Sequence, residues 1–150
     1  MNQTAAKIIT TLEELDRFAE AFLKKHRDGG VFGLSGDLGA GKTTFVRALI
    51  SSISKANGKE VPRVTSPSYV LHQSYSLSPS VDHFDLYRLE AISEETLWEM
   101  GYFDALDKSK ASKGFVFVEW PEKVKQTAQL QLQHTLRFHH LPNGAREITG

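Results

Sequence analysis

Apolar side chains recur at helical spacing close to the amino terminus of the chain. Leucine, phenylalanine and alanine at positions 12, 15, 18, 19 and 22 fall on one face of a helix over about residues 11–26. Thr11 and Glu14 have the spacing of a capping box, in which a hydroxyl and a carboxylate satisfy free backbone N–H groups. The run Asp28-Gly29-Gly30 ends this helix. The apolar residues 31–35 that follow are typical of a buried strand.

The remaining pattern alternates between strand-like and helix-like segments. After a glycine-rich loop at 36–41, we expect a helix with Phe45, Ala48, Leu49 and Ile53 on one face and then an exposed loop at 54–62. Strands are expected at 69–75 and 81–87, followed by a short helix from Ser93 to Gly101. We expect a strand buried on both faces at 115–118, a strand of alternating pattern at 132–138 and, after a turn at 142–144, a last short strand. This order of strands and helices indicates an α/β protein with a central sheet.

Charge and residue usage narrow the classes of function. Eighteen basic residues balance eighteen acidic residues, so the formal net charge is zero. A protein that binds nucleic acid by itself usually carries a basic excess, so direct, autonomous binding of tRNA or DNA is not expected. The absence of cysteine excludes disulfides, thiolate catalysis and cysteine-ligated zinc. No apolar stretch has the length of a membrane span, and the first residues turn charged before a signal-peptide core forms, so a cytoplasmic protein is expected.

Residues 36–43 match the complete phosphate-loop pattern G-x-x-x-x-G-K-[ST]. Phosphate oxygens need several N–H donors that converge on one point, and glycines let the backbone turn tightly enough to aim them. The helix that follows adds its positive amino-terminal end. We expect Lys42 to reach the β- and γ-phosphates of a nucleotide and the Thr43 hydroxyl to ligate Mg²⁺.

The context of this loop defines the expected fold. The loop follows an apolar strand and opens an amphipathic helix, which is the arrangement that makes the pattern specific. A chain of 150 residues with 40% apolar residues is enough for one compact domain. The sequence therefore predicts a single-domain P-loop NTPase-like α/β fold over residues 1–150, with a central mixed sheet flanked by helices.

A magnesium ion between phosphates needs a nearby carboxylate, and two candidates stand on predicted strands. Glu119 ends the strand at 115–118, so it lies at the phosphate-loop edge of the sheet if that strand runs parallel to the one before the loop. Asp85 shares a strand face with His83, for which we expect a hydrogen-bonded structural role because no further zinc ligands are near. The pattern favours Glu119 as the metal-side acid and Asp85 as a residue that orients water or acts as a base. Either carboxylate alternatively serves as an ion-pair partner, with Arg88 the candidate for Asp85.

Five separated segments of the sequence form a set of motifs in a defined order. They are Gly36-Asp-Leu-Gly-Ala-Gly-Lys-Thr-Thr44, Val64-Thr-Ser-Pro-Ser-Tyr-Val-Leu71, His83-Phe-Asp-Leu-Tyr-Arg-Leu89, Glu99-Met-Gly-Tyr102 and Val118-Glu-Trp-Pro121. In this order, over roughly residues 10–150, they resemble the TsaE family, and jointly they are far more specific than a phosphate loop alone. The second is similar to the family's switch-like segment, with Ser68 where threonine is common. Serine keeps the hydroxyl, so we expect function to persist.

The resemblance implies an ATPase needed to form N6-threonylcarbamoyladenosine beside the tRNA anticodon. It also implies ATP and Mg²⁺ as cofactors and a TsaB–TsaD complex as partner, with slow hydrolysis by the isolated chain. By the same resemblance the nucleotide would be held by Gly39, Ala40, Gly41, Lys42, Thr43, Thr44, Trp120 and, in a looser match, Arg146. Thr43 and Glu119 would hold Mg²⁺, while Asp85 and Lys42 would be the catalytic residues.

Three other functions compete with this interpretation. A small-molecule kinase would need an acceptor pocket and an arginine-bearing lid, for which few residues are left. A GTPase is disfavoured because the chain has no D-x-x-G or N-K-x-D segment. A nucleotide-gated binding module with negligible turnover has the same sequence features as an ATPase. No arginine stands in a motif that must place it at the γ-phosphate, which favours activation by a partner.

Overall fold

A computed structural model describes residues 6–150. Residues 1–5, which begin the segment expected to lack a signal-peptide core, lie outside the described residues. The elements in chain order are β1 (Lys7–Ile9), α1 (Leu12–Lys25), β2 (Gly30–Ser35), α2 (Lys42–Ala56), β3 (His72–Tyr75), β4 (Val81–Asp85), α3 (Glu94–Glu99), α4 (Tyr102–Ser112), β5 (Phe115–Glu119), the 3-10 helices η1 (Pro121–Lys123) and η2 (Thr127–Leu130), β6 (His134–His140) and β7 (Arg146–Thr149).

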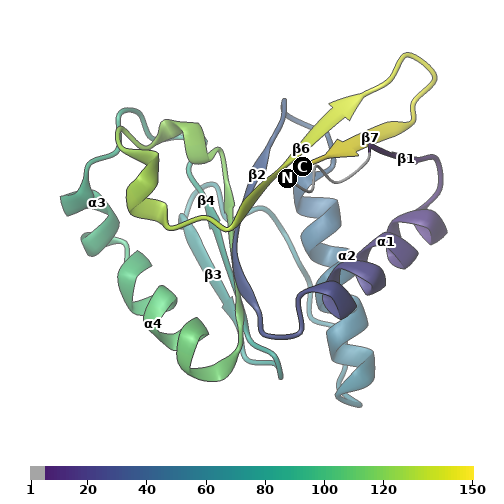
Figure 1. Cartoon of the computed structure of the whole chain (residues 1–150), viewed down its shortest axis with the longest axis horizontal. Coiled ribbons are helices and arrows are strands. Elements are labelled where there is room, and N and C mark those ends of the chain that lie inside the picture. Colours follow the sequence, from purple (N-terminus) through teal and green to yellow (C-terminus); the bar gives the residue numbers. More distant parts are fainter. Residues whose placement is uncertain (1–5) are drawn as a thin grey trace.

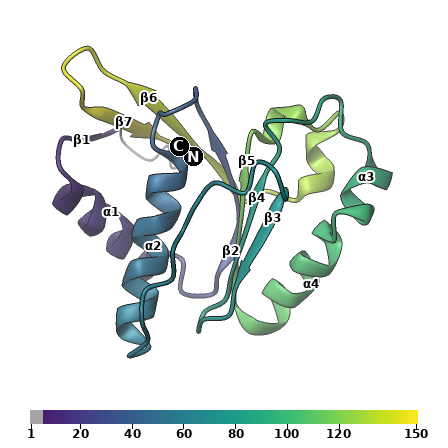
Figure 2. The same cartoon turned by 180° about the vertical axis from the view of Figure 1, so that it is seen from behind.

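The strands within residues 6–150 form one seven-stranded mixed sheet in the order β1-β7-β6-β2-β5-β4-β3. The central strands β6, β2, β5 and β4 are mutually parallel, whereas β1, β7 and β3 pair antiparallel with their neighbours. Helices α1 and α2 cover one face of the sheet, and α3 and α4 cover the other (Figure 1, and from behind in Figure 2). The predicted α/β class, with a mixed sheet flanked by helices, is confirmed.

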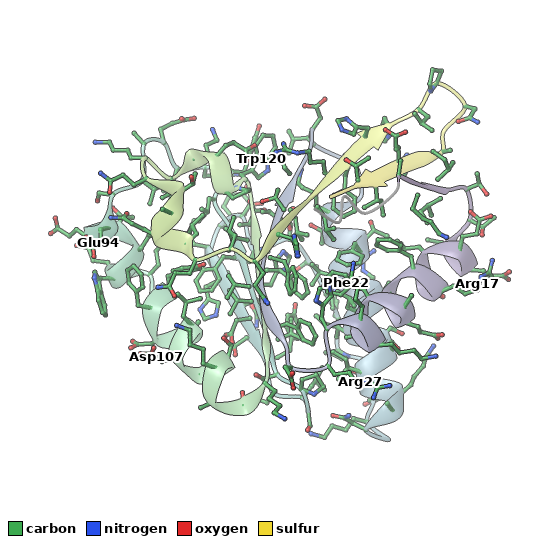
Figure 3. The ribbon with its side chains drawn as sticks, in the orientation of Figure 1. Arg17, Phe22, Arg27, Glu94, Asp107 and Trp120 are labelled. Carbon is green, nitrogen blue, oxygen red and sulfur yellow. The ribbon has the colours of Figure 1, made fainter. Side chains whose placement is uncertain are left out.

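Each face of the sheet packs a separate apolar cluster. The cluster under α1 and α2 is rich in phenylalanine, with the Phe22 ring 4.9 Å from that of Phe32 and 5.4 Å from that of Phe45. Figure 3 places Phe22 between α1 and the sheet. The cluster under α3 and α4 contains the buried Leu97 and Tyr102. Strand β5 contributes to both clusters and is buried along its whole length, as predicted from its continuous apolar run.

The start of α1 follows the sequence prediction with one difference. The Thr11 hydroxyl accepts a hydrogen bond from the Glu14 N–H at 3.1 Å, as an N-cap should. The Glu14 carboxylate, however, accepts from the Thr10 N–H at 2.6 Å and from the Thr10 hydroxyl at 2.9 Å, one residue earlier than in a standard capping box. The carboxylate therefore fixes the connection between β1 and α1.

The structure differs from the predicted elements in several places. The exposed loop expected at 54–62 begins only after Ala56, because residues 54–56 are the last turn of α2 and the Ser54 side chain is buried. The strand expected from Tyr69 begins only at His72, because Leu71 has a left-handed backbone that breaks the extended conformation. Helix α4 was not predicted, since its buried residues are separated by many polar ones and its periodicity is weak.

Candidate functional site

The phosphate loop, residues 36–41, connects β2 to α2 at the middle of the sheet, at the carboxyl end of the parallel strands. Two of its glycines are required by geometry. Gly36 has a φ of 144°, and a Cβ there would lie 2.5 Å from the Phe138 carbonyl oxygen on β6. Gly41 has a φ of 110° immediately before α2. Larger residues would therefore push the loop away from the strand that supports it.

Helix α2 directs its amino-terminal end into the loop. Its N-cap residue is Gly41, which has no side chain to accept a hydrogen bond from the first-turn N–H groups. Free N–H donors at the positive end of a helix are an anion-binding arrangement. The loop therefore presents the backbone donors that its sequence pattern predicts.

Lys42 is 4% exposed and lies within this loop rather than in solvent. Its ammonium group donates to the carbonyl oxygens of Gly36 and, at 3.0 Å, of Asp37. The same Nζ lies 4.5 Å from the centre of the Trp120 ring, a cation–π contact. Burial lowers the pKa of Lys42, and the negative charge of Glu119 acts in the opposite direction.

Thr43 and Glu119 meet beside Lys42. The Thr43 hydroxyl donates to Glu119 Oε2 at 2.9 Å, joining the first turn of α2 to the end of β5. Strand β5 is parallel to β2, the condition under which Glu119 was expected at this edge. His83 Nε2 lies 2.5 Å from the same carboxylate oxygen. The hydrogen bond expected of His83 is therefore present, and its partner is the proposed metal-side acid.

Asp85 is the register partner of Glu119 across β4 and β5, and it holds a different set of donors. Its Oδ2 accepts from the hydroxyls of Ser66 and, at 2.9 Å, of Ser68. Its Oδ1 accepts from the Tyr87 N–H at 3.0 Å. Arg88, the alternative partner considered for Asp85, instead places its guanidinium 3.7 Å from the centre of the Tyr69 ring. The segment that resembles a switch is thus tied to Asp85 by two hydroxyls.

These groups line one cavity of about 240 Å³. Its lining residues are Leu38, Gly39, Gly41, Lys42, Thr43, Thr44, Ser66, Ser68, Asp85, Glu119 and Trp120. Trp120 has a left-handed backbone, with φ of 61°, at the turn between β5 and η1, and Figure 3 places it at this edge of the sheet. A strained non-glycine residue at a site is a common functional signature. Most of the residues assigned from the sequence are therefore brought together here.

Thr43 and Glu119 offer oxygen groups of the kind that Mg²⁺ requires. Mg²⁺ prefers hard oxygen ligands and is usually held by one or two protein groups together with phosphates and water. The Thr43 hydroxyl and the Glu119 carboxylate supply two such oxygens 2.9 Å apart. Among residues 6–150, no group of three or more histidine, cysteine or acidic side chains forms a metal cage. The residues present therefore fit a phosphate-associated Mg²⁺ better than an ion held by protein alone.

A second cavity, of about 190 Å³, adjoins the phosphate loop on its other side. Ala40, Gly41, Thr44 and Arg146 line it together with Ile9, Thr10, Thr11, Leu12, Leu15, Phe138, Gly144 and Ile148. Ala40 and Arg146, both assigned to the nucleotide from the sequence, therefore lie here and not in the first cavity. The contribution of residues 9–15 was missed, because the sequence shows them only as the start of a helix.

Arg146 is oriented by its neighbours in the β6–β7 hairpin. Its Nη1 is 2.7 Å from His140 Nδ1 and 3.2 Å from the Gly144 carbonyl oxygen. Its Nε lies 3.6 Å from where a Cβ of Gly41 would stand. The guanidinium therefore lies beside the phosphate loop, at the wall of the second cavity.

In the part of the chain that the structure describes, every helix is too short or too polar to cross a membrane.

Comparison with known families gives a match over nearly the whole chain. Residues 9–148 match the model of the family described as threonylcarbamoyl adenosine biosynthesis protein TsaE. Three relatives carry the name tRNA threonylcarbamoyladenosine biosynthesis protein TsaE. The Rickettsia felis protein is 33% identical over 79% of this chain and 63% of its own length. The Haemophilus influenzae protein is 37% identical over 71% of this chain and 62% of its own length. The Bacillus subtilis protein is 32% identical over 91% of this chain and 78% of its own length.

Among solved structures, the chain is similar to the crystal structure of Bacillus subtilis YdiB. The TM-score is 0.62 at 24% identity, over 99% of this chain and 84% of the other. This likeness supports the fold. The chain spans less than two thirds of the length of the first two relatives described above.

Proposed function

Because the chain belongs to the TsaE family, we propose that it binds ATP with Mg²⁺, hydrolyses the ATP and thereby supports formation of N6-threonylcarbamoyladenosine beside the anticodon of tRNA. The observation that carries this proposal is the single cavity in which Lys42, Thr43, Asp85 and Glu119 converge on the phosphate loop. Cation, hydroxyl and carboxylates are the groups that phosphoryl transfer to water needs. The same proposal places the protein in the cytoplasm.

Each side chain has a role that follows from its position. Lys42 would exchange its contacts with the Gly36 and Asp37 carbonyls for β- and γ-phosphate oxygens. Thr43 and Glu119 would hold Mg²⁺, which when bound neutralises phosphate charge. Asp85, whose carboxylate already accepts hydroxyl hydrogen bonds, would orient the attacking water and accept its proton.

The second cavity suits the base and ribose of the nucleotide. Its walls combine apolar side chains from residues 9–15 with the guanidinium of Arg146, and it shares Gly41 and Thr44 with the phosphate cavity. A nucleotide with its phosphates over the loop has its base within reach of an adjoining cavity that is largely apolar. Ala40 and Arg146 are therefore assigned to this end of the nucleotide, Gly41 and Thr44 to the boundary between the two cavities, and Trp120 to the phosphate end.

Two features support activation by a partner protein. No arginine among the described residues lines the phosphate cavity, and Arg47, Arg88 and Arg146 are held by Val64, Tyr69 and His140. An arginine at the γ-phosphate is worth about a thousandfold or more in rate. Apolar side chains are also exposed in the phosphate loop and directly after Ser68, which lines the cavity, with Leu38 61%, Tyr69 82% and Val70 66% exposed. We assign the partner as a TsaB–TsaD complex, and with zero net charge the chain is not expected to bind tRNA unaided.

The test is steady-state phosphate release with ATP, with and without the TsaB–TsaD complex. We expect slow release by the isolated chain and clear stimulation by the complex. Replacement of Val70 by serine should reduce the stimulation, whereas the same replacement of Trp98, an exposed side chain on α3, should not. Full activity without the complex would refute partner coupling and favour a self-sufficient ATPase or kinase. Nucleotide binding without release in either condition would favour a binding module.

Nucleotide binding itself has a direct optical readout. The chain contains two tryptophans, of which Trp120 lines the phosphate cavity. In a Trp98→Phe background the fluorescence reports Trp120 alone. We expect ATP with Mg²⁺ to change this signal in the absence of any partner, and an unchanged signal at saturating ATP would contradict the assigned site.

A further inference from the structure

His83 is a fully buried polar side chain that the proposed function does not use. It lies on β4, two residues before Asp85, and its Nε2 is 2.5 Å from Glu119 Oε2. Its second ring nitrogen, Nδ1, is buried without a hydrogen-bond partner among the described residues. A buried polar atom without a hydrogen bond is unfavourable, so a histidine that bonds through one ring nitrogen and leaves the other unpartnered calls for an explanation.

The hydrogen bond defines which ring atom carries the proton. An ionised carboxylate only accepts, so Nε2 must donate to Glu119. The unpartnered Nδ1 then carries the lone pair, since an N–H at this buried position would lack any acceptor among the described residues. The hydrogen bond therefore assigns a proton to His83 Nε2, which donates to the Glu119 carboxylate. The hydrogen bond from Nε2–H restrains the orientation of the Glu119 carboxylate.

Glu119 is held on two sides by donors of different origin. Thr43 approaches Oε2 from α2, and His83 approaches the same oxygen from β4. Without the histidine, the Thr43 hydroxyl would be the one hydrogen-bond donor to this carboxylate among residues 6–150. Lys42 lines the same cavity and is a competing cation, since the charge of Glu119 acts on its pKa. If the Glu119 carboxylate turned and paired with Lys42, the carboxylate would be lost from the metal position and the ammonium group from the phosphate position.

We propose that His83 is a positioning residue that aims the Glu119 carboxylate at the Mg²⁺ position and keeps it from pairing with Lys42. This inference rests on the proposed nucleotide and Mg²⁺ site. Residues that orient a metal ligand through a hydrogen bond typically affect metal affinity by about 10- to 100-fold when replaced. The alternative is that His83 only fills space between β4 and α2.

Two substitutions separate these roles. A glutamine at position 83 carries its amide nitrogen as far from the backbone as Nε2 and can donate to Glu119. An asparagine is one carbon shorter, so its amide ends near the Nδ1 position and does not reach. Both are neutral, polar and smaller than histidine, so both leave similar packing defects. Only a donor role predicts that they differ at the metal.

The measured quantity is metal coupling, defined as the ratio of ATP-analogue affinities with saturating Mg²⁺ and with EDTA. We expect His83→Gln to keep the coupling within about threefold of the wild-type value and His83→Asn to lower it by about 10-fold or more. Affinity in EDTA should change by less than about twofold in both. His72→Gln is the matched control, because His72 pairs with Asp82 on the neighbouring strand and does not line the cavity. It should leave the coupling unchanged.

A measurement on the wild-type protein covers the case in which a variant does not fold. Histidine ¹⁵N spectra should show the His83 proton on Nε2, and the signal should move when Mg²⁺ is added to the nucleotide complex. Equal loss or equal retention of coupling in the two variants, or a proton on Nδ1, would overturn the positioning role. If wild-type protein shows no effect of Mg²⁺ on nucleotide affinity, the proposed site itself fails, and the two failures are thereby distinguished.

Discussion

Replacement of Asp85 by asparagine tests the proposed catalytic role with the smallest change in shape. In the structure Oδ1 accepts from the Tyr87 N–H, and Oδ2 accepts from Ser66 and Ser68. The amide keeps the first bond, and the two hydroxyls rotate to accept from the new NH₂ group. The loss is the difference between hydrogen bonds to a charged and to a neutral partner, about 1–2 kcal/mol of stability because both serines can also be hydrated.

The effect on turnover should be far larger than the effect on folding. Removal of a general base costs about 10²- to 10⁴-fold in rate. Nucleotide affinity should stay within about threefold, since Lys42 and the backbone donors of the loop are unchanged. Single-turnover hydrolysis, binding of a fluorescent ATP analogue and the free energy of unfolding measure the three quantities separately. Hydrogen exchange across residues 66–71 should be faster in the variant, and in the wild type it should differ between ATP-analogue and ADP complexes.

Asp82→Asn is the control. Asp82 is buried on the same strand, but its partners are His72 at 2.8 Å and Lys108 at 3.0 Å on the side away from the phosphate loop. The Asp82→Asn variant should lose about 1–3 kcal/mol of stability. This loss is smaller than that from breaking a fully buried ion pair, because Lys108 is half exposed. The variant should hydrolyse ATP at the wild-type rate. An Asp85→Asn protein that hydrolyses ATP at the wild-type rate would refute the proposed base. Equal kinetic losses in both variants would attribute the effect to strand β4 instead.

Three further outcomes are expected. Lys42→Ala should lower ATP affinity by about 100-fold or more while Lys108→Ala leaves it unchanged, as titration with a labelled nucleotide would show; equal affinities would remove the phosphate assignment. Thr43→Ala and Glu119→Ala should each weaken the dependence of ATP binding on Mg²⁺, and their double mutant should be non-additive because both touch one ion; additive losses would argue for separate roles. Burial raises the pKa of Asp82, but hydrogen bonds from His72 and Lys108 outweigh it, so the folded-state pKa lies below the usual value. The stability that Asp82 contributes is therefore present above about pH 4 and lost as pH falls through the folded-state pKa. In acid denaturation the free energies of unfolding of wild type and Asp82→Asn should converge at low pH. A difference between them that stays constant with pH would contradict a lowered pKa.

The parts of the site that the sequence predicts are those encoded locally. The phosphate loop, its helix and the caps of α1 and α3 each depend on residues a few positions apart, and all lie where expected. Glu119 required one long-range assumption, that its strand is parallel to β2, and an uninterrupted apolar run supports that assumption because such strands are buried on both faces.

What the sequence does not predict depends on contacts between distant segments. Strand β1 has three residues and gains its conformation from pairing with β7, about 140 residues later. So short a segment has no periodicity to detect, and the second cavity, which it helps to line, is invisible without it. The Glu119–His83 contact is similar, since it requires the register of β4 on β5. Helix α4 was missed because tertiary packing, rather than its own amphipathic pattern, defines it.

The pairing of β1 with β7 also bears on when, during synthesis, the proposed nucleotide site can first form. The second cavity takes its walls from residues 9–15 and from residues 138–148, so these segments must meet before it exists. Consider a ribosome-bound chain in which the phosphate loop, α2 and β5 have emerged from the ribosome but the β6–β7 hairpin has not. Such a chain has the phosphate loop but lacks the part of the second cavity that would contact the base. Tight ATP binding should therefore appear only after residue 148 has left the exit tunnel. Ligand-dependent protection would then mark chains in which β1 and β7 have paired and leave chains without the β6–β7 hairpin open to proteolysis.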